Sequence, residues 1–133
     1  IARSPYRDRI VNQGYRTDNE HIFKLYDIFV LPSTNPDPLP TVVLEAMATG
    51  KPVVGYRHGG ICEMVQEGEN GLLAEPRNPE ALAAQIDVLL TNDELREKMG
   101  EHSRMRLMKY FSIEAYAQNY SRQYDMLIQA SNH

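Results

Sequence analysis

Two carboxylates, Asp37 and Glu45, are the side chains of this sequence best placed for chemistry. Both lie near a predicted junction between a loop and a helix, and the helix is expected to run from Thr41 to Ala48. This segment is apolar nearly all round, which is typical of a buried helix. Because a buried carboxylate without partners is costly, Glu45 in the middle of the segment indicates a function.

The start of this helix is a predicted anion site. Side chains on a helix lean toward its N-terminus, so Glu45 is expected to point toward Pro40 and Thr41. That end carries free backbone N–H groups and the positive pole of the helix dipole, which suit a phosphate. A carboxylate beside a phosphate can accept hydrogen bonds from the two hydroxyls of a ribose. The pattern therefore indicates a nucleotide with a diphosphate, and the alternative is a structural salt bridge from Glu45 to a Lys or Arg.

The surrounding pattern alternates strands with helices. Residues 28–31 form a continuous apolar run, as expected for a strand covered on both faces, and residues 52–56 form the next strand. We also predict a strand at 9–13, a helix at 18–26, a short helix at 61–66 and an edge strand at 72–74. This alternation indicates crossover connections and a mostly parallel sheet. The expected fold class is α/β, the latter part of a Rossmann-like doubly wound parallel sheet.

Three C-terminal helices are predicted to follow the sheet. The first begins at the cap Asn78, the second covers residues 93–110, and the third runs from the cap Ser112 to about residue 130. Tyr116, Tyr120 and Leu127 fall on one side of the third helix. We predict that such Tyr and Met stripes belong to the core.

Several motifs together resemble the donor-binding half of the family-4 retaining glycosyltransferases of the GT-B fold. In that family an acidic residue, seven intervening positions and a glutamate form the signature, which Asp37 and Glu45 match. The other matching segments are Asp27 to Ser33, Ala46-Met-Ala, Gly50-Lys-Pro-Val-Val54, Gly59-Gly60-Ile, Glu63 and Asn70-Gly71-Leu-Leu. The resemblance implies a single partial domain over residues 1–133, belonging to a GT-B C-terminal domain. The N-terminal acceptor domain and the first β/α units would be absent from it.

The resemblance also implies roles for individual residues. Asp37 would contact hydroxyls of the transferred sugar, and Glu45 would hold the ribose. Backbone amides would receive the diphosphate around Leu39, Pro40, Thr41 and Val42. The nucleobase would lie against the backbone of Gly14, Tyr15 and Arg16.

The sequence departs from the family pattern at the first part of the signature. The family usually has Glu where this chain has Asp37, and Phe-Gly where it has Leu39-Pro40. Asp is one methylene shorter, and Pro40 has no N–H to give to a phosphate, although proline suits the first position of a helix. These departures leave open which sugar is bound and which amides bind phosphate.

A second loop, Tyr56-Arg57-His58-Gly59-Gly60, follows a predicted strand and so lies at the carboxyl edge of the sheet, where α/β folds bind ligands. Gly59 and Gly60 would let the backbone approach a phosphate or sugar. His58 is expected to make a hydrogen bond within the loops. Arg57 is either a surface residue or a phosphate contact.

Composition excludes several classes of function. The chain has 133 residues, 42% of them hydrophobic, and a formal net charge of -4 without a Lys/Arg cluster, so we expect no nucleic-acid binding. The histidines have no partners at metal-ligand spacing, and we expect no metal site and no cofactor other than the nucleotide-sugar donor itself. One cysteine, Cys62, and the lack of a signal peptide or apolar span favour a cytoplasmic location, with the parent peripheral at a membrane as an alternative.

Together with the resemblance, these features favour part of a metal-independent glycosyltransferase that moves a sugar from a nucleoside diphosphate to an unknown acceptor with retention. No Lys or Arg occurs from Ser33 to Ala48 to stabilise the leaving diphosphate, so we expect weak donor binding and no transfer by this chain alone. Alternatives are a nucleotide-sugar epimerase of GT-B fold and a non-catalytic module for nucleotide-sugar binding or dimerisation. A glycosidase is less favoured, because its two acids must face each other across a bond. The truncated sheet edge is a candidate for self-association.

Overall fold

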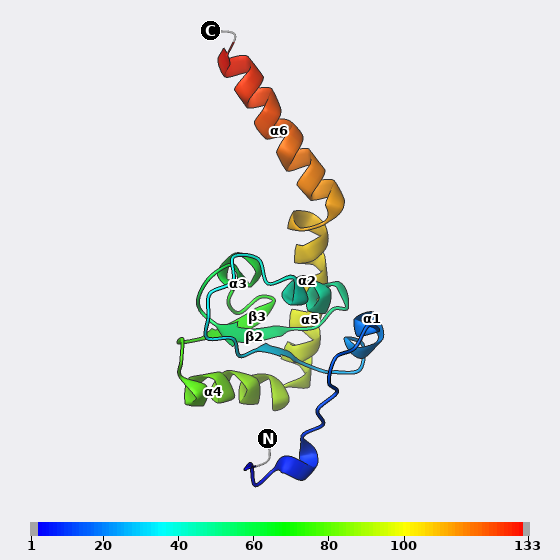
Figure 1. The fold of residues 1–133 in the computed structure, drawn as a ribbon, viewed down its shortest axis with the longest axis vertical. Coiled ribbons are helices and arrows are strands. Elements are labelled where there is room, and N and C mark those ends of the chain that lie inside the picture. Colours follow the sequence, from blue (N-terminus) through cyan, green and yellow to red (C-terminus); the bar gives the residue numbers. More distant parts are fainter. Residues whose placement is uncertain (1–2, 132–133) are drawn as a thin grey trace.

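The computed structural model describes residues 3–131, which fold around a three-stranded parallel sheet in the order β1-β2-β3 (Figure 1). The strands are β1 (Phe29–Leu31), β2 (Val53–Tyr56) and β3 (Gly71–Ala74). In the register, Val30 lies beside Val54, and Val54 lies beside Leu72. Helices cover both faces of the sheet, so the predicted α/β, Rossmann-like doubly wound fold is confirmed.

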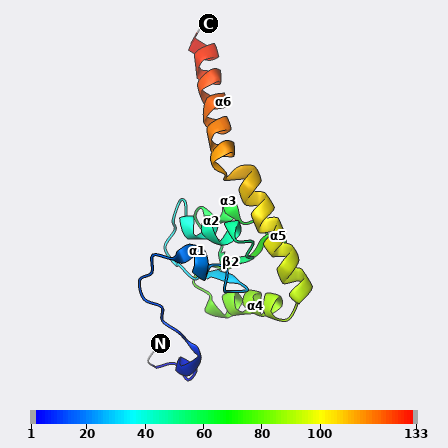
Figure 2. The ribbon, with the colours of Figure 1, turned by 90° about the vertical axis from the view of Figure 1, so that its right-hand side faces the viewer.

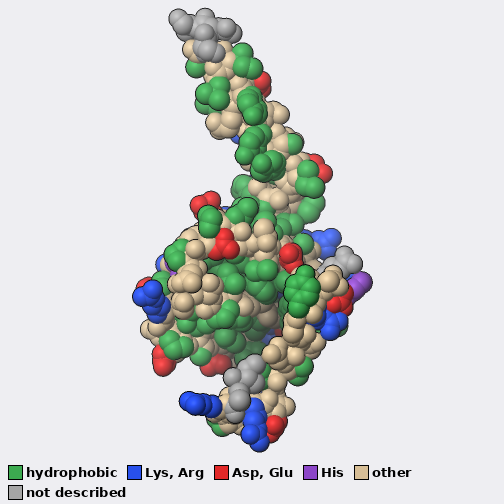
Figure 3. All heavy atoms as spheres, viewed as in Figure 1, with side chains coloured by type: hydrophobic (Ala, Val, Ile, Leu, Met, Phe, Trp, Pro, Cys, Tyr) green, Lys and Arg blue, Asp and Glu red, His purple; other side chains and the backbone are tan. Residues whose placement is uncertain are grey.

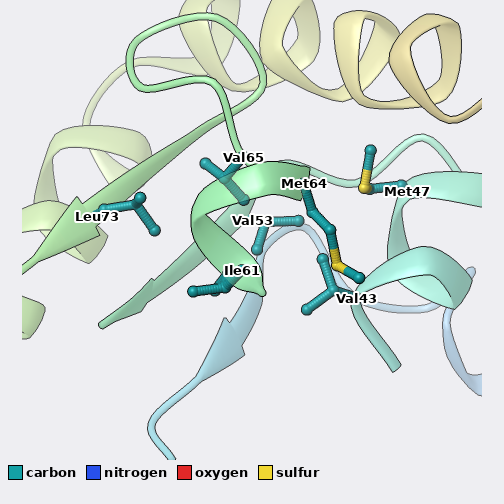
Figure 4. Close-up of a cluster of buried hydrophobic side chains, with 7 residues drawn as sticks. All are labelled: Val43, Met47, Val53, Ile61, Met64, Val65 and Leu73. Carbon is teal, nitrogen blue, oxygen red and sulfur yellow. The ribbon is translucent and has the colours of Figure 1, made fainter. Parts of the chain in front are cut away.

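One face of the sheet packs against α2 (Thr41–Ala48) and α3 (Ile61–Met64), the helices of the two crossover connections. Figure 4 shows this cluster, in which side chains of both helices meet Val53 and Leu73 between them. Val53 is fully buried, and burial of such a side chain contributes roughly 1.5–3 kcal/mol. This layer holds the start of α2 at the carboxyl edge of the sheet.

The opposite face packs against α4 (Pro79–Leu90) and the first part of α5 (Asp93–Tyr110). Successive residues of a strand point to opposite faces, so Val54 and Leu72 belong to this second cluster. Both faces of β2 are therefore apolar, as the continuous apolar runs predicted. Two glycines mark close approaches: a Cβ at Gly55 would clash with Ile61, and one at Gly71 would clash with the carbonyl of Val53.

The helices α4 and α5 begin at the predicted residues, α4 after the predicted cap Asn78 and α5 after Asn92, which was not predicted as a cap. Asn78 Oδ1 accepts a hydrogen bond from the Ala81 N–H at 2.9 Å, and Asn92 Oδ1 accepts one from the Leu95 N–H at 3.0 Å. Midway along α5, Gly100 packs against the turn that joins α2 to β2, and a Cβ there would clash with the carbonyl of Gly50. Gly100 thus lets α5 lie close to the sheet layer.

The last helix, α6 (Ile113–Ser131), projects away from the sheet (Figures 1 and 2). Tyr116 is 60% exposed, Tyr120 is 51% exposed and Leu127 is 66% exposed, and Figure 3 shows apolar side chains along this helix. The prediction that this stripe belongs to the core is wrong for this chain. The apolar residues do fall on one side of α6, but the helix extends beyond the sheet and the helices α2 to α5 that this side would need to contact.

The N-terminal segment departs most from the prediction. A short 3-10 helix (Arg7–Arg9) precedes an irregular stretch, and the strand predicted at 9–13 is not formed. A strand needs a hydrogen-bonded neighbour, and β1 has a neighbouring strand on one side only. The predicted helix at 18–26 is shortened to α1 (Asn19–Ile22). Within residues 3–131, no helix is long and apolar enough to cross a membrane.

Candidate functional site

Two loops lie side by side at the carboxyl edge of the sheet. The β1–α2 loop covers residues 32–40, and the β2–α3 loop covers residues 57–60. Because β1 and β2 are parallel neighbours, their carboxyl ends open on the same edge, where α/β folds bind ligands. Asp37 precedes the α2 start at this edge, Glu45 lies one turn into the helix, and the two acids line different hollows.

Asp37 lies in the first of these, the inner hollow, between the β1–α2 loop and the β2–α3 loop. This hollow has a volume of about 70 Å³, and Ser33, Tyr56 and His58 also line it. The Asp37 side chain is exposed, and its Oδ1 accepts a hydrogen bond from the Leu39 N–H at 2.9 Å. This bond fixes the carboxylate at the rim of the hollow and leaves Oδ2 available to a ligand.

Glu45 lies in the second hollow, the outer hollow, which has a volume of about 380 Å³ and is also lined by Thr17, Phe23 and Thr49. The expectation that Glu45 is buried is wrong, because α2 buries only one side and exposes Glu45 on the other. The cost of burial therefore gives no argument for its function. The salt-bridge alternative is also not formed, since Glu45 has no ion pair with any residue between 3 and 131.

Glu45 affects the ionisation of the neighbouring Tyr26. Tyr26 is partly buried, and its pKa is raised first by this burial and second by the charge of Glu45. An exposed carboxylate without an ion-pair partner can accept hydrogen bonds from ligand hydroxyls.

The tip of α2 borders the inner hollow, which Pro40 and Val42 line, whereas the outer hollow lies beside the later part of the helix, at Ala48 and Thr49. No side chain caps this helix, whose N-cap residue is Pro40. Within the described part of the chain, the N–H groups of Thr41 and Val42 have no acceptor. Leu39 already donates to Asp37, and Pro40 has no N–H, so two of the four predicted amide positions are available to an anion.

Gly59 and Gly60 pack against the Asp37 loop. The Gly60 N–H donates to the Asp37 carbonyl at 2.8 Å, and Gly59 has a φ of 61°, in the left-handed region. A Cβ at Gly59 would lie 2.7 Å from the Asp37 carbonyl oxygen, and a Cβ at Gly60 would clash with the carbonyl of Pro38. The sequence suggested close approach of a ligand, whereas the structure shows close approach of the two loops to each other.

His58 makes the predicted hydrogen bond between loops. Its Nε2 lies 2.7 Å from the Ser33 carbonyl oxygen, and its ring stacks on Tyr56 with centroids 6.4 Å apart. Since a carbonyl oxygen only accepts, Nε2 carries the proton. Ser33 did not emerge from the sequence as a site residue, because its backbone carbonyl rather than its side chain makes the contact.

The predicted nucleobase segment is not brought to either hollow. Gly14, Tyr15 and Arg16 follow the strand that is not formed, and Tyr15 is 95% exposed. Arg16 instead pairs with Asp18, with 2.6 Å between Nη2 and Oδ2. This pair raises the pKa of Arg16 and lowers the pKa of Asp18.

No Lys or Arg lines either hollow within residues 3–131. Arg57, which the sequence left as a surface residue or a phosphate contact, pairs with Glu67 at 2.6 Å. Positive potential for a diphosphate comes here from the tip of α2, equivalent to roughly half an elementary charge. In the described residues, no group of three His, Cys, Asp or Glu side chains could hold a metal ion.

The first curated relatives that the chain matches are about three times as long as the chain. N-acetyl-alpha-D-glucosaminyl L-malate synthase of Bacillus anthracis is 34% identical over 121 residues, which are 90% of this chain and 32% of that enzyme. The chain spans between 27% and 33% of the first three curated relatives that it matches.

Solved structures show the same fold. Anabaena Alr3699/HepE in complex with UDP has a TM-score of 0.84 at 27% identity, over 90% of this chain and 33% of that chain. The same Anabaena protein in complex with UDP-glucose has a TM-score of 0.77 at 27% identity, over 85% of this chain and 31% of that chain.

The family described as glycosyl transferases group 1 matches residues 6–106, which include β1 to β3, both hollows and most of α5. This match covers most of the chain and agrees with the fold of the solved structures. The chain therefore belongs to the group 1 glycosyl transferases of the GT-B fold.

Proposed function

We propose that this chain forms the donor-binding part of a glycosyltransferase, which moves a sugar from a nucleoside diphosphate to an acceptor with retention of anomeric configuration. The observation that carries the proposal is the uncapped tip of α2 with its free N–H groups, which lies between Asp37 in the inner hollow and the exposed Glu45 one turn further along the same helix. A nucleotide sugar has matching parts, with ribose and sugar hydroxyls on either side of a diphosphate.

The diphosphate would bind at the tip of α2. The free N–H groups of Thr41 and Val42 and the helix dipole favour an anion there. Glu45 is one helical turn after Thr41 on the same side of α2, so a diphosphate at the tip leaves a ribose within its reach. Glu45 would accept hydrogen bonds from the ribose hydroxyls in the outer hollow.

The inner hollow would receive hydroxyls of the transferred sugar. Asp37 lies at the rim of this hollow, and its Oδ2 would orient them. No covalent nucleophile is implied, and the residues described here act by positioning the donor.

Charge limits what the chain does alone. Both carboxylates are negative and no Lys or Arg lines the hollows, so the charge that develops on the leaving diphosphate must be stabilised by residues outside this chain. We therefore expect weak donor binding and no transfer by the isolated chain. The complexes of the Anabaena protein with UDP and with UDP-glucose support a nucleotide sugar as the donor class.

An epimerase is less supported, because it needs acid and base side chains at the sugar. His58 is a candidate for that role in the inner hollow, but its Nε2 is occupied by the Ser33 carbonyl and its Nδ1 is buried. An acceptor-free assay for epimer formation by the full-length parent would distinguish the two activities.

The test of the proposal is Glu45→Ala in the full-length parent. Loss of two hydrogen bonds to a charged acceptor, each contributing roughly 1.5–3 kcal/mol, should weaken nucleoside-diphosphate binding at least tenfold and lower turnover. Glu80→Ala, at an exposed position on α4, is the matched control. Donor affinity by titration calorimetry and turnover that both remain unchanged in Glu45→Ala would refute the assigned role.

A further inference from the structure

The loop that carries Asp37 is held in place by the β2–α3 loop. His58 Nε2–H donates to the Ser33 carbonyl at 2.7 Å, and the Gly60 N–H donates to the Asp37 carbonyl at 2.8 Å. Among the described residues, no other hydrogen bond joins residues 33–39 to a different segment. The position of Asp37 therefore depends on two contacts from the neighbouring β/α unit.

These two contacts secure different parts of the loop. Gly60 holds its middle, where the backbones of the two loops pack too closely for a Cβ. His58 holds its beginning, directly after β1, where Ser33 leaves the sheet. A loop fixed at one point can still pivot about it, whereas a loop fixed at two points has a defined orientation.

The His58 ring itself is well placed to act as a fixed donor. It stacks on Tyr56, which is 5% exposed at the end of β2. Its Nδ1 is buried and has no hydrogen-bond partner in the described part of the chain. Because an unpaired buried acceptor is unfavourable, the imidazole is a poor choice for stability alone at this position. Its use there is explained by the bond that Nε2 makes.

We propose that His58 is a positioning residue for Asp37, which it orients toward the donor sugar by fixing the Ser33 carbonyl. This inference rests on the proposed role of Asp37 as a contact to the transferred sugar. His58 then affects the part of donor affinity that comes from the sugar. The nucleoside diphosphate would bind at the first amides of α2 and at Glu45, on a helix that is held by its own packing against the sheet, so its affinity should not depend on the His58 contact to the start of the loop.

The first test uses the 133-residue chain and needs no ligand. His58→Phe keeps an aromatic ring on Tyr56 but removes the donor, while His58→Gln presents an amide N–H at a similar reach. Backbone ¹⁵N order parameters of Thr34, Asn35, Asp37 and Leu39, the residues of this segment that carry an N–H, should fall below about 0.6 in His58→Phe and stay near wild type in His58→Gln. His102→Phe, on α5 away from the loops, is the control. Order parameters that do not change in His58→Phe would overturn the proposal.

The second test uses the full-length parent, with UDP, GDP and the corresponding sugars UDP-glucose, UDP-N-acetylglucosamine and GDP-mannose as probes. For the sugar that the wild type binds, His58→Phe should weaken the nucleotide sugar by about the same factor as Asp37→Ala and leave the bare nucleotide unchanged. His58→Gln should restore the affinity. The double variant should be no weaker than Asp37→Ala alone, because both changes remove one contact.

The outcomes separate the two proposals. A wild-type parent that binds none of these probes would refute the proposed function. A parent that binds a nucleotide sugar equally well with His58→Phe, or that loses nucleotide and nucleotide-sugar affinity to the same extent, would refute the role of His58 while the donor site stands. Additive losses in the double variant would also refute it.

Discussion

Replacement of Gly100 by alanine should destabilise the chain, although alanine is the better helix former. At a solvent-exposed position this change stabilises a helix by roughly 0.8–1 kcal/mol. In α5, however, the new Cβ would clash with the carbonyl of Gly50 and lie 3.6 Å from Cδ of Pro52. These atoms belong to the turn between α2 and β2, which cannot rotate away as a flexible side chain could.

The size of the effect follows from these opposing terms. Overpacking of a close contact typically costs about 1–3 kcal/mol, and a backbone neighbour places Gly100→Ala toward the upper part of that range. After the gain in helix propensity is subtracted, we expect the free energy of unfolding to fall by roughly 1–2 kcal/mol. A fall of this size is a large fraction of the stability of a small domain.

Urea unfolding of the 133-residue chain, followed by circular dichroism, measures this change. The control is Arg104→Ala, at an exposed position on the same helix, which should change the free energy of unfolding by less than about 0.5 kcal/mol. A Gly100→Ala chain that is as stable as wild type, or more stable, would show that α5 does not pack against the Gly50 turn as described.

Three further predictions concern stability and ionisation. Asn78→Ala removes the cap of α4 and should lower the free energy of unfolding by about 1 kcal/mol in the same urea assay, and an unchanged midpoint would contradict the capping bond. Arg16→Ala should raise the pKa of Asp18 toward its ordinary value, because the Arg16 bond lowers it; carboxyl ¹³C shifts during an NMR titration report this, and an unmoved midpoint would count against the pair. The stability that this bond contributes is present above the ordinary pKa of Asp and is lost as the pH falls through the lowered one. Tyr120→Ser, on the exposed stripe of α6, should change the free energy of unfolding of this chain by less than about 0.5 kcal/mol, and a loss above 2 kcal/mol would mean that the stripe is packed in solution.

The sequence was sufficient to predict the elements whose position depends on contacts between residues that are close in the chain. The caps Asn78 and Asn92 form bonds within their own first turns, so α4 and α5 begin where residue types alone place them. The apolar runs of β1 and β2 also needed no further information, since a strand covered on both faces has apolar residues at every position.

The failures arise where the outcome depends on neighbours that are distant in sequence. Glu45 was expected to be buried because α2 is apolar, but which side of α2 packs is decided by the position of α3 and the sheet. The strand at 9–13 has suitable residues but no hydrogen-bonded partner strand. The role of the Ser33 carbonyl in the site had no sequence signal, because every residue type has that group.

Both faces of β2 are apolar, so the alternation of apolar and polar residues that usually sets the register of a strand is absent here. In most sheets, a slip by one residue would move polar side chains into the core, but here it would exchange one apolar side chain for another. Gly55 and Gly71 restrict the register instead, because a slip would bring a residue with a Cβ to one of these positions, where it would clash with Ile61 or with the Val53 carbonyl. The absence of a side chain at these two positions therefore helps to fix the register of the strands and the point at which each loop leaves the sheet.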